Sequence, residues 1–143
     1  MIRVVLDTNV VVSSLLSDGS PKVLLDLAFD QSFAWYISEP ILAEYRVVLS
    51  YPRLQIDPID ARRTIAAIRK TARLVKPSLI LKEATDEEDN RFLECAQASK
   101  ANYLVTGNLR HFPKAWKYTK VVSPRQFLSL WEIQQPTRGN PYD

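Results

Sequence analysis

The stretch Met1-Ile2-Arg3-Val4-Val5-Leu6-Asp7-Thr8-Asn9 decides the fold that we expect for this chain. Its apolar run, residues 2–6, is hydrophobic on both faces, which is typical of a strand buried in a parallel sheet covered on two sides. The run ends at Asp7, and ligands of open α/β sheets gather beyond the carboxyl ends of the strands. Asp7 is therefore a candidate site residue. Because aspartate also caps helices often, the stretch alone favours neither role.

The composition is that of one ordinary globular domain. The 143 residues are 46% hydrophobic and 24% charged, which is enough apolar material for a single core. The formal net charge of +3, from 19 Lys and Arg against 16 Asp and Glu, permits nucleic-acid binding without requiring it. A single cysteine excludes an internal disulfide, and neither a signal peptide nor a membrane-spanning run is recognisable. We therefore expect a cytoplasmic protein with no membrane association.

Strand-like and helix-like segments alternate along the whole chain. The expected strands are 2–6, 33–37, 102–106 and 120–122, with either 74–76 or 79–81 in addition. The expected helices are 8–16, 20–28, 39–49, 58–74, 85–99 and 124–131, most of them opened by a capping residue or a proline. Such alternation implies a three-layer α/β/α sandwich around a mainly parallel sheet of about five strands. We expect one domain over residues 1–132 and a mobile tail over residues 133–143.

Glu44 is the second candidate. On a helical wheel it lies about 60° from Ile41, so it flanks the apolar stripe of its helix rather than opposing it. A carboxylate in that position is partly buried and must be paired, protonated or metal-bound. The alternative is an ordinary glutamate at the edge of an amphipathic helix, meeting a lysine or water.

Asp86 and Asp89 are the third and fourth candidates. They lie three apart in the first turn of the helix expected from Thr85, on the side that also carries Phe92 and Leu93. Acidic residues in a first turn also complement the helix dipole. That alternative explains the two intervening glutamates well, but it explains Asp89 on the apolar side less well.

Asn108 follows an apolar strand just as Asp7 does. A Gly-Asn pair is also a common turn, but parallel strands would bring Asp7 and Asn108 to the same edge of the sheet. Oxygen ligands without cysteine or histidine suit Mg²⁺ or Mn²⁺ rather than zinc, and such an ion relieves the repulsion between carboxylates. Because Mg²⁺ keeps waters and favours phosphate oxygens, the set points to phosphodiester chemistry.

Four motifs in order carry a resemblance to a known family. They are VVLDTNVVVSSLL (4–16), SEPILAEYRVVL (38–49), TDEEDNRFLECAQASKANYLVTGN (85–108) and RHFP (110–113). The chain resembles the PIN-domain family of metal-dependent ribonucleases, and within it the VapC-like toxin components of toxin–antitoxin systems, from about residue 2 to residue 130. The resemblance implies an α/β/α sandwich, an acidic pocket for one or two Mg²⁺ or Mn²⁺ ions, a homodimer and a cognate antitoxin protein.

The resemblance also assigns site residues. It places the catalytic and metal-binding positions on Asp7, Glu44 and Asp89, with Asp86 alongside. Three polar residues, Thr8, Asn9 and Thr106, correspond to those that support the ligands. Many relatives have aspartate where this chain has Asn108, whose amide oxygen can bind a hard cation but carries no charge. Catalysis by one metal and catalysis by two therefore both stay open.

Basic residues cluster in two acid-free segments. Residues 61–76 contain Arg62, Arg63, Arg69, Lys70, Arg73 and Lys76, and residues 100–125 contain Lys100, Arg110, Lys114, Lys117, Lys120 and Arg125. Solvated helix faces explain the first cluster equally well. The second begins beside Asn108 and is interleaved with aromatic residues, so we expect RNA contacts at Arg110, His111, Lys114 and Lys117.

These observations predict a Mg²⁺- or Mn²⁺-dependent endoribonuclease that leaves 5′-phosphate and 3′-hydroxyl ends, acting as the toxin of a toxin–antitoxin pair. Two alternatives stay open. One is a PIN-like module that binds RNA or a protein partner with weak or lost catalysis, which Asn108 suggests. The other is an unrelated α/β hydrolase or phosphotransferase with Asp7 as nucleophile. Asn9 argues against the latter, because a second aspartate would be expected there.

Overall fold

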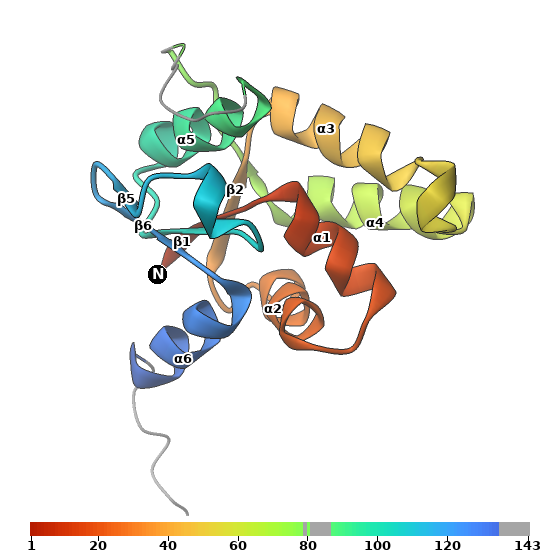
Figure 1. Ribbon diagram of the computed structural model, residues 1–143, viewed down its shortest axis with the longest axis horizontal. Coiled ribbons are helices and arrows are strands. Elements are labelled where there is room, and N and C mark those ends of the chain that lie inside the picture. The colour runs from red at the N-terminus through yellow and green to blue at the C-terminus, as the bar shows by residue number, and fades with distance from the viewer. Residues whose placement is uncertain (79, 81–86, 135–143) are drawn as a thin grey trace, which may run out of the picture.

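The computed structural model describes residues 1–78, 80 and 87–134, without the side chains of Glu87 and Glu88. Asp86, the predicted cap at Thr85 and most of the predicted tail, residues 135–143, lie outside the described residues. The rest of the chain forms the α/β architecture that the alternation predicts (Figure 1).

The described residues form one six-stranded sheet. Its strands are β1 (Arg3–Leu6), β2 (Ala34–Ile37), β3 (Arg73–Leu74), β4 (Tyr103–Val105), β5 (Ala115–Trp116) and β6 (Thr119–Val122), in the order β3-β2-β1-β4-β6-β5. All neighbours are parallel except β5 and β6. The central strand β1 is buried from Val4 to Leu6, as expected of a parallel strand covered on both faces.

Six α-helices in the described residues pack around this sheet. They are α1 (Thr8–Leu16), α2 (Ser20–Phe29), α3 (Glu39–Leu49), α4 (Pro58–Thr71), α5 (Glu87–Ser99) and α6 (Pro124–Gln134), with short 3₁₀ turns η1 (Pro52–Leu54) and η2 (Leu109–His111). In Figure 1, α5 lies above the strands and α2 and α6 lie below them, while α1, α3 and α4 gather to the right. α5 contacts β1, β2 and β4, and α6 contacts β4. The three-layer prediction is confirmed.

Capping side chains fix several helix starts. The Ser38 hydroxyl accepts a hydrogen bond from the Ile41 amide at the start of α3, and the Asp57 carboxylate accepts one from the Ile59 amide at the start of α4. At α6, Ser123 and Gln126 form a reciprocal capping box, with backbone amides 2.9 Å and 3.1 Å from the opposite side-chain oxygens. These are among the boundaries that the sequence predicts well.

Two predicted boundaries are wrong and one strand was missed, and each difference has a tertiary cause. α4 ends at Thr71 rather than near residue 74, because Arg73 and Leu74 pair with β2 as strand β3. β5 was not predicted; it forms an antiparallel pair with β6 across a turn in which Lys117 has a φ of 56°. α6 continues to Gln134, whose side-chain amide donates to the Tyr103 hydroxyl at 2.7 Å.

An aromatic group ties α6 to the sheet. The Phe127 ring meets Phe33 and Tyr103 edge to face, with centroids 5.2 Å and 5.6 Å away. Phe127 and Phe33 are essentially inaccessible to solvent. In the described part of the chain, no helix has both the length and the apolar character needed to cross a membrane.

Candidate active site

The ends of the two central strands bring Asp7 and Thr106 together. β1 and β4 pair in parallel with Leu6 opposite Val105, so the residues that follow leave the sheet side by side. The Asp7 amide donates to the Val105 carbonyl at 2.9 Å, and the Thr106 hydroxyl donates to Asp7 Oδ2 at 2.7 Å. Asp7 is 6% exposed and Thr106 is fully buried. The strand end therefore holds a buried, oriented carboxylate.

Asp7 fills both roles that the sequence left open. Its extended backbone makes it the N-cap of α1, and its Oδ1 accepts a hydrogen bond from the Thr8 amide at 2.7 Å. Oδ2 accepts from Thr106, so both carboxylate oxygens are held by protein donors. Capping and participation in a site are compatible at this position.

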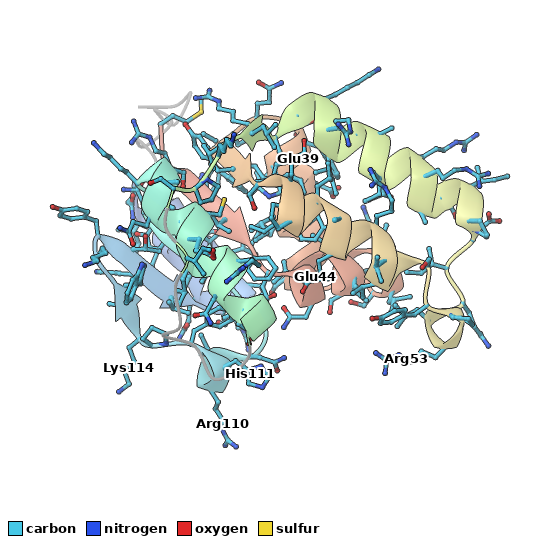
Figure 2. All side chains as sticks on the ribbon, turned by 90° about the horizontal axis from the view of Figure 1, so that it is seen from above. Glu39, Glu44, Arg53, Arg110, His111 and Lys114 are labelled. Carbon is cyan, nitrogen blue, oxygen red and sulfur yellow. The ribbon has the colours of Figure 1, made fainter. Side chains whose placement is uncertain are left out.

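Two consecutive residues of α3 attach that helix to the end of β1, beside Asp7. The Thr8 hydroxyl donates to Oε2 of Glu44, which is half-buried, and the hydroxyl of Tyr45 donates to the Leu6 carbonyl. Figure 2 shows Glu44 on α3, with Arg110 and His111 across from it. Thr8 thus connects Asp7 and Glu44, through its amide and its hydroxyl respectively.

Burial dominates the electrostatics of these groups. It raises the pKa of Asp7 above its usual 3.8, while the bonds from Thr106 and Thr8, the charge of His111 and a bond with Asn9 act in the opposite direction. Burial, then the neighbouring Cys95, Asp7 and Glu44, raises the pKa of Tyr45 well above 10, so its hydroxyl stays a neutral donor. A cation beside Asp7 would relieve the cost of its ionisation.

The loop after β4 is tied back to α1 and to Thr106. The side-chain oxygen of Asn9 accepts from the Gly107 amide at 2.9 Å, and the Thr106 hydroxyl accepts from the Asn108 amide at 2.9 Å. Asn108 itself is exposed, and its side chain does not cap η2. The loop therefore orients Thr106 through its backbone and leaves the Asn108 side chain facing solvent.

Asp89 reaches this region from the start of α5. Its side chain is 13% exposed, and its Oδ2 lies 3.4 Å from Nδ1 of His111 on η2. His111 also lies close enough to Asp7 to lower the pKa of that carboxyl. In Figure 2, Arg110 and Lys114 extend outward from the same part of the surface. Lys117 is exposed at the β5–β6 turn, with its ammonium 5.3 Å from the centre of the Trp116 ring.

The donor chemistry fits a hard divalent cation, although no closed cluster is formed. Among residues 1–78, 80 and 87–134, no group of three or more His, Cys, Asp or Glu side chains could hold a metal. The described residues instead supply Asp7 and Glu44, joined by Thr8, and Asp89, reached through His111. All three offer carboxylate oxygens, the ligands that Mg²⁺ and Mn²⁺ prefer. Asp86 lies outside the described residues.

Sequence reasoning missed two polar contributions around these carboxylates. The first is Tyr45, which lies in the apolar stripe beside Glu44; a tyrosine in such a stripe is itself a sign of a buried hydroxyl that needs an acceptor. The second is a pair on α5, in which Nε of Arg91 lies 2.9 Å from Oε2 of the buried Glu94. Their spacing of three residues on a helix is the signal that could have revealed it.

Comparison with known proteins adds two findings. The sequence model of the PIN domain family matches residues 3–110, a span that contains Asp7, Glu44, Asp89 and Asn108. An uncharacterized protein of Methanocaldococcus jannaschii, MJ1680, is 31% identical to this chain in an alignment that covers 92% of each chain. The family match therefore includes both central strands and all described acidic candidates.

Proposed function

The chain belongs to the PIN-domain family, whose members are generally nucleases, and from that premise we propose that it is a Mg²⁺- or Mn²⁺-dependent endoribonuclease. One observation carries the proposal. It is the buried Asp7 carboxylate, held by Thr106 and linked through Thr8 to Glu44 at the carboxyl end of the central strand. Asp7, Glu44 and Asp89 would hold the cation, with Asp86 and Asn108 assisting directly or through water.

The protein's own contribution is to orient these groups and to keep Asp7 ionised. The donors from Thr8 and Thr106 fix the carboxylate plane and offset part of the rise in the pKa of Asp7 that burial causes. When bound, a divalent cation supplies a water of lowered pKa and stabilises charge on the scissile phosphate. The products would carry 5′-phosphate and 3′-hydroxyl ends.

The proposed substrate is single-stranded RNA. Arg110, His111, Lys114 and Lys117 are exposed on or near η2, beside Asp89, and they supply positive charge that can follow a phosphate backbone. The cluster on α4 is a less direct candidate for RNA contact. Two of its arginines, Arg62 and Arg69, line a groove against α3 in which none of the described acidic candidates takes part.

Cleavage of unstructured RNA tests this proposal. We expect wild-type protein to cleave with Mg²⁺ or Mn²⁺ and to stop when a chelator is added, with 5′-phosphate ends that support ligation to an adapter. Products that form equally fast in chelator, or that end in cyclic phosphates, would contradict the metal-dependent mechanism.

We further propose that this nuclease is the toxin of a toxin–antitoxin pair, acts in the cytoplasm and forms a homodimer. The groove between α3 and α4 supports a protein partner, because Arg46, Arg62 and Arg69 surround apolar side chains such as Leu49 and Ile65. That arrangement complements an acidic amphipathic segment of an antitoxin.

Growth arrest on expression, relieved by the product of a small gene immediately upstream, tests the toxin–antitoxin pair. Unaffected growth with active protein present would contradict it, and light scattering checks the dimer.

The second candidate function is a PIN-like module that binds RNA or a protein with weak or lost catalysis. Asn108 favours it, since an uncharged amide stands where many relatives have a carboxylate. If the enzyme is active as we propose, Asn108→Asp should tighten binding of a second cation and raise the cleavage rate by less than about tenfold. The exposed position of Asn108 makes a change in stability small. A rise of more than about a hundredfold over wild type would instead favour the binding module.

A further inference from the structure

A cleft between α3 and α5 opens beside the candidate active site. Its volume is about 270 Å³, and Glu44 forms part of its wall. The rest of the α3 side includes Val47 and, just beyond the helix, Tyr51, while Arg91 and Phe92 line the α5 side. A group bound there would therefore lie next to a residue that we assign to the metal.

The size and lining of the cleft suit one planar ring system. Pockets for drug-sized ligands occupy about 300–1,000 Å³, so this cleft is slightly smaller than that range. Val47 is 54% exposed and Tyr51 is 38% exposed, which leaves apolar and aromatic surface open to solvent beside a polar site. Aromatic side chains in such positions are the usual stacking partners of unpaired RNA bases.

Arg91 brings a guanidinium group to the wall of the cleft. Its Nε contacts Glu94, but its Nη2 is buried and has no hydrogen-bond partner among the residues that the structure describes. A buried N–H without an acceptor is costly, so an acceptor that meets Nη2 once the Arg91 side chain turns into the cleft gains that free energy. Arginine donors match the acceptor edge of guanine, formed by O6 and N7, better than the edges of the other bases.

Positive charge flanks Glu44 on two sides. The guanidinium of Arg53 lies 5.4 Å from the centre of the ring of Tyr51, which lines the cleft. In the view of Figure 2, Glu44 lies between Arg53 on one side and Arg110 and His111 on the other. An RNA strand that crosses Glu44 can therefore meet cationic side chains both before and after it.

We propose that this cleft is a nucleobase subsite, an inference that rests on the proposed nuclease activity. An unpaired base adjacent to the scissile phosphate enters it, stacks on Tyr51 and accepts a hydrogen bond from Arg91. Guanine is the preferred base, and Arg53 contacts the neighbouring phosphate. The subsite thus selects where the RNA is cut, while the carboxylates carry out the reaction.

Binding of defined oligomers tests the subsite without cleavage. The probes are a fluorescent oligouridylate and the same oligomer with one central guanosine, titrated by anisotropy in the presence of chelator. We expect wild type to prefer the guanosine oligomer, and Tyr51→Ala to weaken its binding about tenfold, the size of one lost stacking contact. Tyr51→Phe, which keeps the ring, should restore most of the affinity. Val23→Ala, a similarly exposed position on α2, is the matched control.

Cleavage mapping separates this proposal from the nuclease proposal. With metal present, Tyr51→Ala should raise KM about tenfold with a smaller change in kcat. Arg91→Lys should flatten the base preference at the cut site, because lysine cannot reproduce the guanidinium geometry. If wild type cleaves RNA but Tyr51→Ala binds and cuts as wild type does, the subsite is overturned and the nuclease stands. If wild type does not cleave, the nuclease proposal fails, and the anisotropy result alone decides whether the cleft binds a base.

Discussion

Asp7→Asn is expected to lower metal-dependent cleavage on the order of a thousandfold while raising the melting temperature of the metal-free protein by a few degrees. Asp7 is buried, and both of its carboxylate oxygens accept hydrogen bonds, from Thr8 and Thr106. Asparagine has nearly the same shape and keeps one acceptor, so the strand end should stay folded. What is lost is the negative charge on which cation binding depends.

The gain in stability follows from the direction of the pKa shift. Burial raises the pKa of Asp7 above 3.8, so the folded protein holds this proton to a higher pH than the unfolded chain does. As the pH rises from the unfolded value through the folded value, ionisation of Asp7 destabilises the metal-free wild type, and the cost persists above that window. Asparagine does not ionise and avoids the cost. Added Mg²⁺ or Mn²⁺ should raise the melting temperature of wild type and leave Asp7→Asn unchanged.

Parallel cleavage assays and thermal melts measure both effects. Asp26→Asn is the matched control, since Asp26 is an exposed aspartate of α2 whose ion pair with Lys22 lies on the surface. Exposed pairs of this kind contribute little, so cleavage and metal-induced stabilisation should equal those of wild type. Cleavage by Asp7→Asn at the wild-type rate would remove the assignment of Asp7 to the metal.

The alternation of segments was enough to predict the sheet, because its inner strands are continuous apolar runs. Val4, Val5 and Leu6 are inaccessible to solvent, and a run that is apolar on both faces has few other places in a fold. β5 could not be predicted in this way. It is only two residues long, and its pairing depends on a left-handed turn at Lys117. No local sequence pattern predicts that turn. β3 likewise depends on a tertiary contact, because its residues pair in parallel with β2.

The site was predictable where chemistry follows from position in an element. Asp7 ends a buried strand, and the helical phase places Glu44 beside an apolar stripe, so both were identified from spacing. The bonds that join them were not identifiable. Whether Thr8 reaches Glu44, and whether Tyr45 reaches the Leu6 carbonyl, depends on how α3 packs against α1 and β1. The unpartnered Nη2 of Arg91 also depends on packing, because the ion pair with Glu94 is made through Nε.

Thr106→Val is expected to reduce cleavage by about 10–100-fold and stability by about 1–3 kcal/mol. Valine fills the same volume but has no hydroxyl. The change removes the donor to Asp7 Oδ2 and also the acceptor of the Asn108 amide, both within a fully buried position. The carboxylate then loses a fixed orientation, and the loop that carries Asn108 and η2 loses its anchor. Thr106→Ser keeps both bonds and should retain most of the activity.

The pH dependence separates this effect from simple destabilisation. The Thr106 bond lowers the pKa of Asp7 against the effect of burial, so its loss should raise that pKa further above 3.8. Because a proton on Asp7 competes with the cation, the acid limb of the pH–rate profile should move to higher pH in Thr106→Val, and Thr106→Ser should keep the wild-type profile. An acid limb that is unchanged in a folded Thr106→Val protein would mean that Asp7 does not need Thr106 to stay ionised. The Thr106 hydroxyl would then serve only to anchor the loop.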